Sequence, residues 1–188
     1  TGSHKLFVHD SLTSSSFHSP TIADLDPTIK CLYNTQAGTF LTASGCTIKI
    51  WNSTNGMLER VYRNIVPNEI SACCLDDASK KFIIGDVTGS IYVFNCLNGS
   101  CMKSIHNKAA REITSVAYVP ILKNIIATAW DGALYFYDET DDETIPLIKR
   151  MKQHKGEITC SAYSMKLTLF ATGASDGSIY LWDYRAHA

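Results

Sequence analysis

The stretch Ser175–Asp183, with the sequence SDGSIYLWD, decides the fold. It opens with a tight-turn sequence, because Gly177 can take a positive φ and Asp176 can hydrogen-bond its own backbone. Four apolar residues follow, a run too short for a helix and rich in residues that favour strands. They do not alternate with polar residues, which is typical of a strand buried on both faces. The stretch therefore predicts a turn followed by a buried strand.

The same pattern recurs along the chain. It is found at residues 5–10, 47–52, 90–95 and 133–138, and each copy ends on Asp or Asn. The closing positions are 10, 52, 95, 138 and 183, so the steps are 42, 43, 43 and 45 residues. A fixed step in this range is the signature of a repeat architecture. One period from end to end indicates a single repeat array.

Each full repeat divides into four short strands, of which the fourth is the most polar, as suits an outer edge. Antiparallel four-stranded units that are buried on both faces form the blades of a β-propeller, each covering the flank of the next. We therefore predict an all-β fold, a partial propeller of about four to five blades. The expected segments are the tail of a preceding repeat with a Ser/Thr-rich loop (1–27), blade 1 (28–66), blade 2 (67–109), blade 3 (110–153) and blade 4 (154–188), which lacks its outer strand. A cloning scar followed by a disordered arm is the alternative for the first residues.

The closing pairs resemble those of the WD-repeat family, in which a Gly-His pair precedes the first strand and a Trp-Asp pair closes the third. Residues 182–183 are Trp-Asp and 51–52 are Trp-Asn, whereas 94–95 and 137–138 keep an aromatic followed by Asn or Asp. His154 stands before the first strand of the last repeat, although Gln replaces the family's Gly. The turns are also similar to those of large WD-repeat proteins of motile cilia and protists.

Four residues of the last repeat, His154, Thr172, Asp176 and Trp182, combine a hydroxyl, an imidazole and a carboxylate, as a catalytic triad does. The resemblance implies a structural role instead. In such repeats the turn Asp holds the imidazole, the hydroxyl bonds the other ring nitrogen, and the indole N–H completes a buried network that fixes the blade. Only the last repeat has the full set, so the network is in doubt in the other blades.

Composition excludes several classes of function. The 188 residues include 17 basic and 18 acidic ones, without the basic excess of a nucleic-acid-binding surface. No apolar run approaches a membrane span, and the polar N-terminus does not resemble a signal peptide. The seven cysteines include no Cys-x-x-Cys pair, which favours buried, reduced thiols in a cytosolic protein. Phosphate loops, metal-binding His-Glu-x-x-His and nucleophile elbows are missing too. We therefore expect no cofactor, no metal, no catalytic residue and no enzymatic activity.

Two features are candidates for binding. Trp130 sits in a turn at the rim where propeller loops meet, and large aromatics are common interface anchors. Arg111 and Glu112 precede the first strand of the same blade, so we expect them on the same surface. The alternative is that Trp130 packs under the neighbouring loop. The acidic run 138–143 is expected to be a solvated loop, with a docking site for a basic partner as the alternative.

The favoured function is a non-catalytic scaffold that binds other proteins or peptides through its loops, without nucleic acid or membrane. The alternative is a regulatory or catalytic propeller domain of a larger enzyme or complex. We expect a cytoplasmic location, with a cytoskeletal or ciliary association left open. The two terminal flanks are expected to be covered by more of the same chain, by a second copy, or by closure into a strained small ring.

Overall fold

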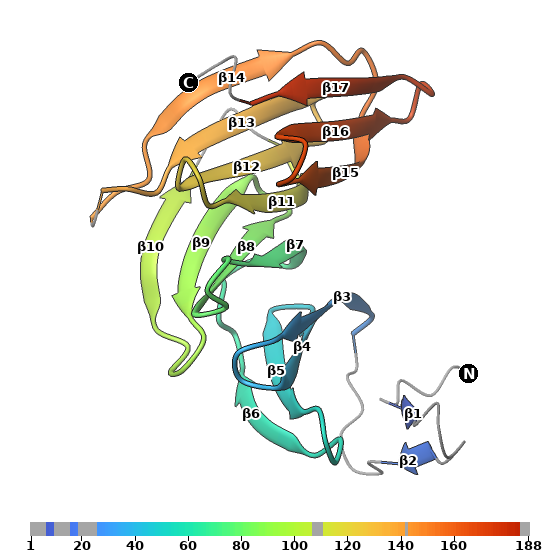
Figure 1. Cartoon of the computed structure of the whole chain (residues 1–188), viewed down its shortest axis with the longest axis vertical. Coiled ribbons are helices and arrows are strands. Elements are labelled where there is room, and N and C mark those ends of the chain that lie inside the picture. The colour runs from blue at the N-terminus through green and yellow to red at the C-terminus, as the bar shows by residue number, and fades with distance from the viewer. Residues whose placement is uncertain (1–6, 10–15, 19–25, 107–110, 142, 185–188) are drawn as a thin grey trace. The chain divides into compact units, whose positions relative to one another are not determined.

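A computed structural model describes residues 7–9, 16–18, 26–106, 111–141 and 143–184. These residues form strands and turns without a helix, and therefore contain no helix that could cross a membrane. The chain divides into two compact units, Thr1–Ile70 and Ser71–Ala188, which are described separately. Figure 1 labels the strands.

The first unit contains two antiparallel sheets. The smaller one pairs β1 with β2, and the larger one is blade 1, with the strand order β3-β4-β5-β6. The side chains of Leu41, Ile48 and Trp51 are buried in blade 1. The bounds are β1 Phe7–His9, β2 Ser16–His18, β3 Thr28–Asn34, β4 Thr39–Ser44, β5 Thr47–Asn52 and β6 Leu58–Tyr62.

The second unit contains three sheets at the positions expected for blades 2, 3 and 4. Blades 2 and 3 have four strands, and blade 4 has three among the described residues, with the order β15-β16-β17. The bounds are β7 Ile70–Leu75, β8 Lys81–Asp86, β9 Ser90–Asn95 and β10 Cys101–His106 in blade 2, β11 Ile113–Val119, β12 Asn124–Ala129, β13 Ala133–Asp138 and β14 Leu147–Lys152 in blade 3, and β15 Ile158–Ser164, β16 Leu169–Ala174 and β17 Ile179–Asp183 in blade 4.

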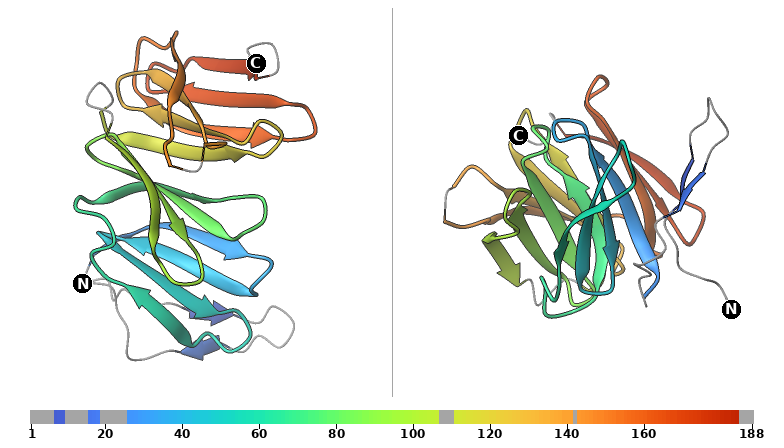
Figure 2. Two further views of the ribbon diagram at one scale, coloured as in Figure 1. Left: turned by 90° about the vertical axis from the view of Figure 1, so that its left-hand side faces the viewer. Right: turned by 90° about the horizontal axis from the view of Figure 1, so that it is seen from below.

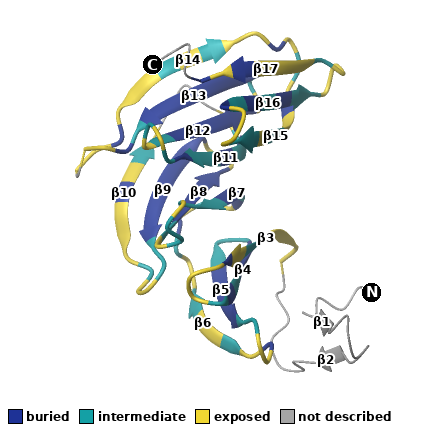
Figure 3. Ribbon diagram, viewed as in Figure 1, coloured by how far each residue is buried: buried dark blue, intermediate teal, exposed yellow. Residues whose placement is uncertain are grey.

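In blades 2 and 3, burial differs sharply between the third and the fourth strand. The third strands β9 and β13 are buried at every position except the last, as their unbroken apolar runs predict. The fourth strands β10 and β14 are mostly exposed, which agrees with their polar sequences. Figure 3 shows the contrast between the dark blue strands β9 and β13 and their mostly yellow neighbours β10 and β14.

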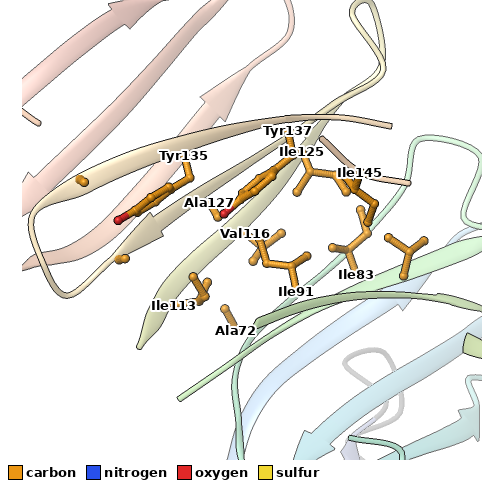
Figure 4. Packing of buried hydrophobic residues seen from close by; sticks show 13 residues of the cluster. Ala72, Ile83, Ile91, Ile113, Val116, Ile125, Ala127, Tyr135, Tyr137 and Ile145 are labelled. Carbon is orange, nitrogen blue, oxygen red and sulfur yellow. The ribbon is translucent and has the colours of Figure 1, made fainter. Parts of the chain in front are cut away.

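Blades 2 and 3 pack face to face through one hydrophobic cluster. Ile83 and Ile91 of blade 2 meet Ile113, Tyr135 and other side chains of blade 3 (Figure 4). Each fully buried side chain of this size contributes about 1.5–3 kcal/mol, so the interface is a main source of stability. Gly85 is required here, because a Cβ atom at this position would overlap the side chain of Ile113. The two blades are therefore held at a close approach that only glycine permits.

Blades 3 and 4 share a second cluster with different side chains. Leu134 and Phe136 of blade 3 pack with Phe170, Trp182 and Tyr184 of blade 4. The inner strands β11 and β15 run side by side, as the left view of Figure 2 also shows. Each of the two interfaces in the second unit thus has its own set of residues.

The opposite face of blade 4 is apolar and uncovered. The side chains of Ile179 and Leu181 on β17 are 75% and 69% exposed. They pair in register with Gly173 and Ala171 of β16, so the four residues lie on one side of the sheet. The equivalent positions of blades 2 and 3 are buried against the next blade. Blade 4 therefore exposes the face that blades 2 and 3 each bury against the next blade.

All seven cysteines are free, but the expectation that they are buried was wrong for several of them. Cys73 is buried, whereas Cys31, Cys101 and Cys160 are exposed. Although Cys31 and Cys101 are exposed, partial desolvation by neighbouring residues raises the pKa of both thiols, and desolvation raises the pKa of Cys96 to about 12. These three thiols are therefore protonated and weakly nucleophilic at neutral pH.

Candidate functional site

The turn between β12 and β13 carries the most exposed tryptophan of the chain. The side chain of Trp130 is 47% exposed, whereas Trp51 and Trp182 are 2% and 7% exposed. Trp130 is thus half open to solvent rather than packed beneath a neighbouring loop. Its backbone N–H donates to the carbonyl of Glu112 at 2.9 Å. The structure therefore joins the Trp130 turn to the residue before β11, and Arg111 is exposed next to it.

Backbone geometry fixes the same turn from the other side. Gly132 has a φ of +77°, which side chains rarely tolerate, and a Cβ atom there would lie 2.7 Å from the carbonyl oxygen of Gly156. It would also lie 2.9 Å from the carbonyl oxygen of His154. The Trp130 turn therefore rests against the loop that leads into blade 4.

A charged network beneath the turn was missed by the sequence reasoning. The Asp131 carboxylate accepts hydrogen bonds from the Tyr135 hydroxyl and the Arg150 guanidinium, both at 2.8 Å, and from the Ala133 N–H at 3.0 Å. Arg150 also donates to the Tyr135 hydroxyl at 3.1 Å. Burial raises the pKa of Asp131, but these hydrogen bonds outweigh it and hold the pKa below its usual range. The ionised Asp131 carboxylate thus fixes the turn through its hydrogen bonds to neighbouring strands.

His154, Thr172 and Trp182 form one hydrogen-bonded chain in blade 4. The Trp182 indole N–H donates to the Thr172 hydroxyl oxygen at 2.8 Å, and this oxygen lies 2.7 Å from Nε2 of His154. Since an indole N–H can only donate, the Thr172 hydroxyl is free to donate its own proton to Nε2. Nδ1–H of His154 then donates to the Ser178 hydroxyl, 2.8 Å away. This assignment gives a neutral imidazole.

The expected place of Asp176 needs a correction. Its carboxylate accepts the backbone N–H of Ser178 at 2.9 Å, and the Ser178 hydroxyl, not this carboxylate, is hydrogen-bonded to His154. Burial lowers the pKa of His154, while the charge of Asp176 opposes this effect. Asp176 therefore fixes the backbone of the turn and acts on the imidazole through its charge, while the Ser178 hydroxyl makes the hydrogen bond to His154.

The other blades keep only parts of this network. In blade 1, the Trp51 indole N–H donates to the Thr42 hydroxyl at 2.9 Å. In blade 2, the buried Asp86 carboxylate accepts the backbone N–H groups of Thr88 and Ser90, at 2.9 and 2.8 Å. The acid of the blade 2 turn is thus Asp86, which stands two residues before Thr88. Different residues thus make the stabilising hydrogen bonds in each blade.

The acidic run 138–143 is not a uniformly solvated loop. The side chain of Glu139 is 4% exposed, and its carboxylate binds Lys81 at 2.6 Å and Lys103 at 3.2 Å. Lys103 also donates to the backbone carbonyls of Glu139 and Asp141. Thr140, Asp141 and Glu143 are exposed, and residue 142 lies outside the described part of the chain. The loop is therefore fastened to blade 2 through one buried carboxylate.

The titratable groups described above are each engaged by other residues of the chain. Within the described residues, no group of three His, Cys, Asp or Glu side chains is arranged to hold a metal ion. The imidazole of His154 and the carboxylate of Asp131 are each engaged by structural partners. The exposed aromatic of the Trp130 turn and the uncovered apolar face of blade 4 are both available on the surface.

Comparison with known proteins agrees with the architecture. Residues 146–183 match the family model described as WD domain, G-beta repeat, which here runs from β14 to the end of β17. The chain is 26% identical over 165 residues to cilia- and flagella-associated protein 337 B of Tetrahymena thermophila, covering 87% of the chain and 13% of that protein. It is 28% identical over 131 residues to the WD repeat-containing protein on Y chromosome of Anopheles gambiae, covering 68% of the chain and 12% of that protein. The chain thus spans about an eighth of these relatives.

Two solved structures share the fold. The computationally designed Ika4 protein superposes with a TM-score of 0.69 and 19% identity, over 85% of this chain and 92% of that one. A chain of the mitotic checkpoint complex superposes with a TM-score of 0.73 and 15% identity, over 89% of this chain and 51% of that one. The two superpositions show the propeller-like fold, the family model identifies a WD repeat in residues 146–183, and the chain as a whole is similar to WD-repeat proteins.

Proposed function

We propose that this chain is a non-catalytic scaffold that binds other proteins or peptides through the rim formed by Trp130, Arg111 and Glu112. WD-repeat proteins generally act as protein-interaction scaffolds, which supports the class of function. The observation that carries the proposal is the half-exposed Trp130 on a turn that is fixed on both sides. An aromatic held in place binds without losing much conformational freedom, which favours affinity.

The polar networks of the second unit support a non-catalytic role. We propose that the chain of His154, Thr172 and Trp182 stabilises blade 4, since each polar atom in it has a partner. A catalytic base needs an open side towards a substrate, and the buried His154 is 2% exposed. The hydrogen bonds of His154 thus support a structural role for this imidazole and not a catalytic one.

The proposed location is cytoplasmic, with an association with cilia or the cytoskeleton. A relative that aligns with 87% of the chain is named as associated with cilia and flagella, and another is named as a probable cytosolic assembly factor. Partners would be other proteins, a second copy of the chain, or further blades of the same chain on the exposed face of blade 4.

The test compares partner capture by the wild type, Trp130→Ala and Ile121→Ala. Ile121 is the matched control, because it is 58% exposed and lies in the turn at the opposite end of β12. Trp130→Ala is expected to weaken capture from native extract by about thirtyfold, which corresponds to about 2 kcal/mol. Its thermal melt should match that of the wild type. Equal capture by Trp130→Ala, or equal loss with Ile121→Ala, would contradict the proposal.

A second measurement uses Trp130 itself as the probe. It is the one strongly exposed residue of the three tryptophans, so acrylamide should quench mainly its fluorescence. A captured partner that covers the rim should protect this component. Quenching that stays the same in the complex would place the partner elsewhere.

A further inference from the structure

The loop between β13 and β14 carries a threonine in a distinctive charge pattern. Thr140 is followed by Asp141, Asp142 and Glu143, and no other Ser or Thr in the chain is followed by three acidic residues. Kinases select their substrates in part by such charge patterns, because basic pockets bind the carboxylates. The charge pattern after Thr140 therefore matches the kind of site that acidophilic Ser/Thr kinases select.

The structure makes the threonine accessible. The side chains of Thr140, Asp141 and Glu143 are exposed, and they lie in a loop outside the strands. Thr144 in the same loop is also exposed, but Ile145 and Pro146 follow it instead of acids. Both threonines are thus accessible to a kinase, but only Thr140 is followed by the acidic residues that an acidophilic kinase recognises.

The same loop attaches blade 3 to blade 2. On the inner side, the Glu139 carboxylate binds Lys81 and Lys103 of blade 2. Lys103 donates to the carbonyls of Glu139 and Asp141, the residues on either side of Thr140. On the outer side, the Thr140 hydroxyl donates to the Asp138 carboxylate at 2.6 Å. Thr140 thus sits directly over the attachment point.

We propose that Thr140 is the phosphate acceptor of an acidophilic Ser/Thr kinase, and that its phosphate loosens the attachment of this loop to blade 2. In the reaction, the γ-phosphoryl group of ATP passes to Oγ1, the hydroxyl proton passes to the kinase's catalytic carboxylate, and ADP leaves. The inference is independent of the partner-binding rim, which lies at the other end of the β13 strand.

The direction of the effect follows from the charges. A phosphate adds a charge of about −1.5 to −2 and cannot donate to Asp138 as the hydroxyl does. Hydrogen bonds, first of all from the Thr140 hydroxyl, lower the pKa of Asp138, and the backbone N–H of Glu143 lowers that of Asp141. Both neighbours are therefore anions at neutral pH. The charge of Lys103 already acts on both carboxylates, but its ammonium is held by the Glu139 carboxylate and by two backbone carbonyls. We therefore expect repulsion between the new phosphate and the two carboxylates to exceed the attraction of the phosphate to Lys103.

The first test treats the folded 188-residue chain with casein kinase 2 and ATP, and locates phosphate by mass spectrometry of peptides. Wild type and Thr144→Ala are expected to gain one phosphate on Thr140, Thr140→Ser one at the same position, and Thr140→Ala none. Glu143→Gln should lower kcat/KM by about tenfold or more, the effect of losing one charge-assisted contact. A wild type that stays unmodified, or phosphate on another residue, would overturn the assignment.

The second test measures the consequence by thermal melting of the purified phosphorylated chain. The Tm is expected to fall by about 2–4 °C, the shift for one weakened contact in a domain of this size. Amides of residues 139–141 and 143–145 should exchange faster with deuterium than in chain treated with kinase but no ATP. An unchanged or higher Tm would overturn the loosening.

Discussion

Replacing Thr172 by Val tests the hydrogen-bonded chain of blade 4 most directly. The change exchanges one hydroxyl for a methyl group at nearly constant volume, at a side chain that is 1% exposed. The indole N–H of Trp182 loses its acceptor at 2.8 Å, and Nε2 of His154 loses its partner at 2.7 Å. An orphaned buried polar group costs about 1–3 kcal/mol, so we expect the free energy of unfolding to fall by about 2–4 kcal/mol.

The assay is urea unfolding followed by circular dichroism. Thr159→Val is the matched control, because this threonine lies in the same blade with an exposed side chain, and we expect a change of less than about 0.5 kcal/mol. The double variant His154→Ala/Thr172→Val should lose less than the sum of the single losses, since both remove the same contact. The reasoning is refuted if Thr172→Val unfolds like the control, or if the two losses add fully.

The same network makes stability depend on pH. Burial lowers the pKa of folded His154 below the ordinary value of 6.5, against the smaller opposing effect of Asp176. As the pH falls through about 6.5, the unfolded chain therefore binds a proton before the folded one does. The contribution of neutral His154 is complete above this pH and declines below it, by at most about 1.4 kcal/mol per pH unit. His154→Gln should lack this component, and an unchanged pH dependence in the variant would contradict the neutral assignment.

Three further outcomes are expected. Glu139→Gln should lower the free energy of unfolding by about 2–4 kcal/mol in urea, because it leaves a buried ammonium without its carboxylate; equal stability would mean that the attachment contributes nothing. Gly85→Ala should cost about 1–3 kcal/mol in the same assay, since the added methyl group overlaps Ile113, and a neutral result would show that the blades can separate freely. Light scattering of the 188-residue chain should show association that Ile179→Lys with Leu181→Lys suppresses, as the uncovered face is worth on the order of 8 kcal/mol for roughly 300 Å²; a dilute, well-folded wild-type monomer would refute this.

The repeat step and the strand pattern were sufficient to predict the blades. The third strands were predicted to within about one residue, because their turns and apolar runs are local signals that each repeat provides again. The exposure of Trp130 also agrees with its place in a turn. The partner that would bind there is not encoded in any local pattern, and the binding role of Trp130 stays a prediction.

What the sequence could not provide depends on distant residues. Glu139 belongs to a run of acids, and its burial results from Lys81 and Lys103, which lie 58 and 36 residues away. The network of Asp131 needs Arg150, which pairs with Tyr135 in the β13–β14 register. The pairing of Arg150 with Tyr135 could have been found by aligning the two strands. The burial of Glu139 could not, because it depends on how blades 2 and 3 pack together.

The different residues at the two interfaces of the second unit also bear on how such a chain avoids misassembly. Adjacent repeats of similar sequence can exchange partners during folding, which is a characteristic failure of repeat proteins. Here Ile83 and Ile91 meet tyrosines at one interface, whereas Leu134 and Phe136 meet a tryptophan and another tyrosine at the next. A blade that docked in the wrong place would meet side chains of the wrong shape, and the close approach at Gly85 would have no counterpart. The divergence between the repeats thus favours packing of each blade against its correct neighbour, and it disfavours domain-swapped assemblies while the chain folds.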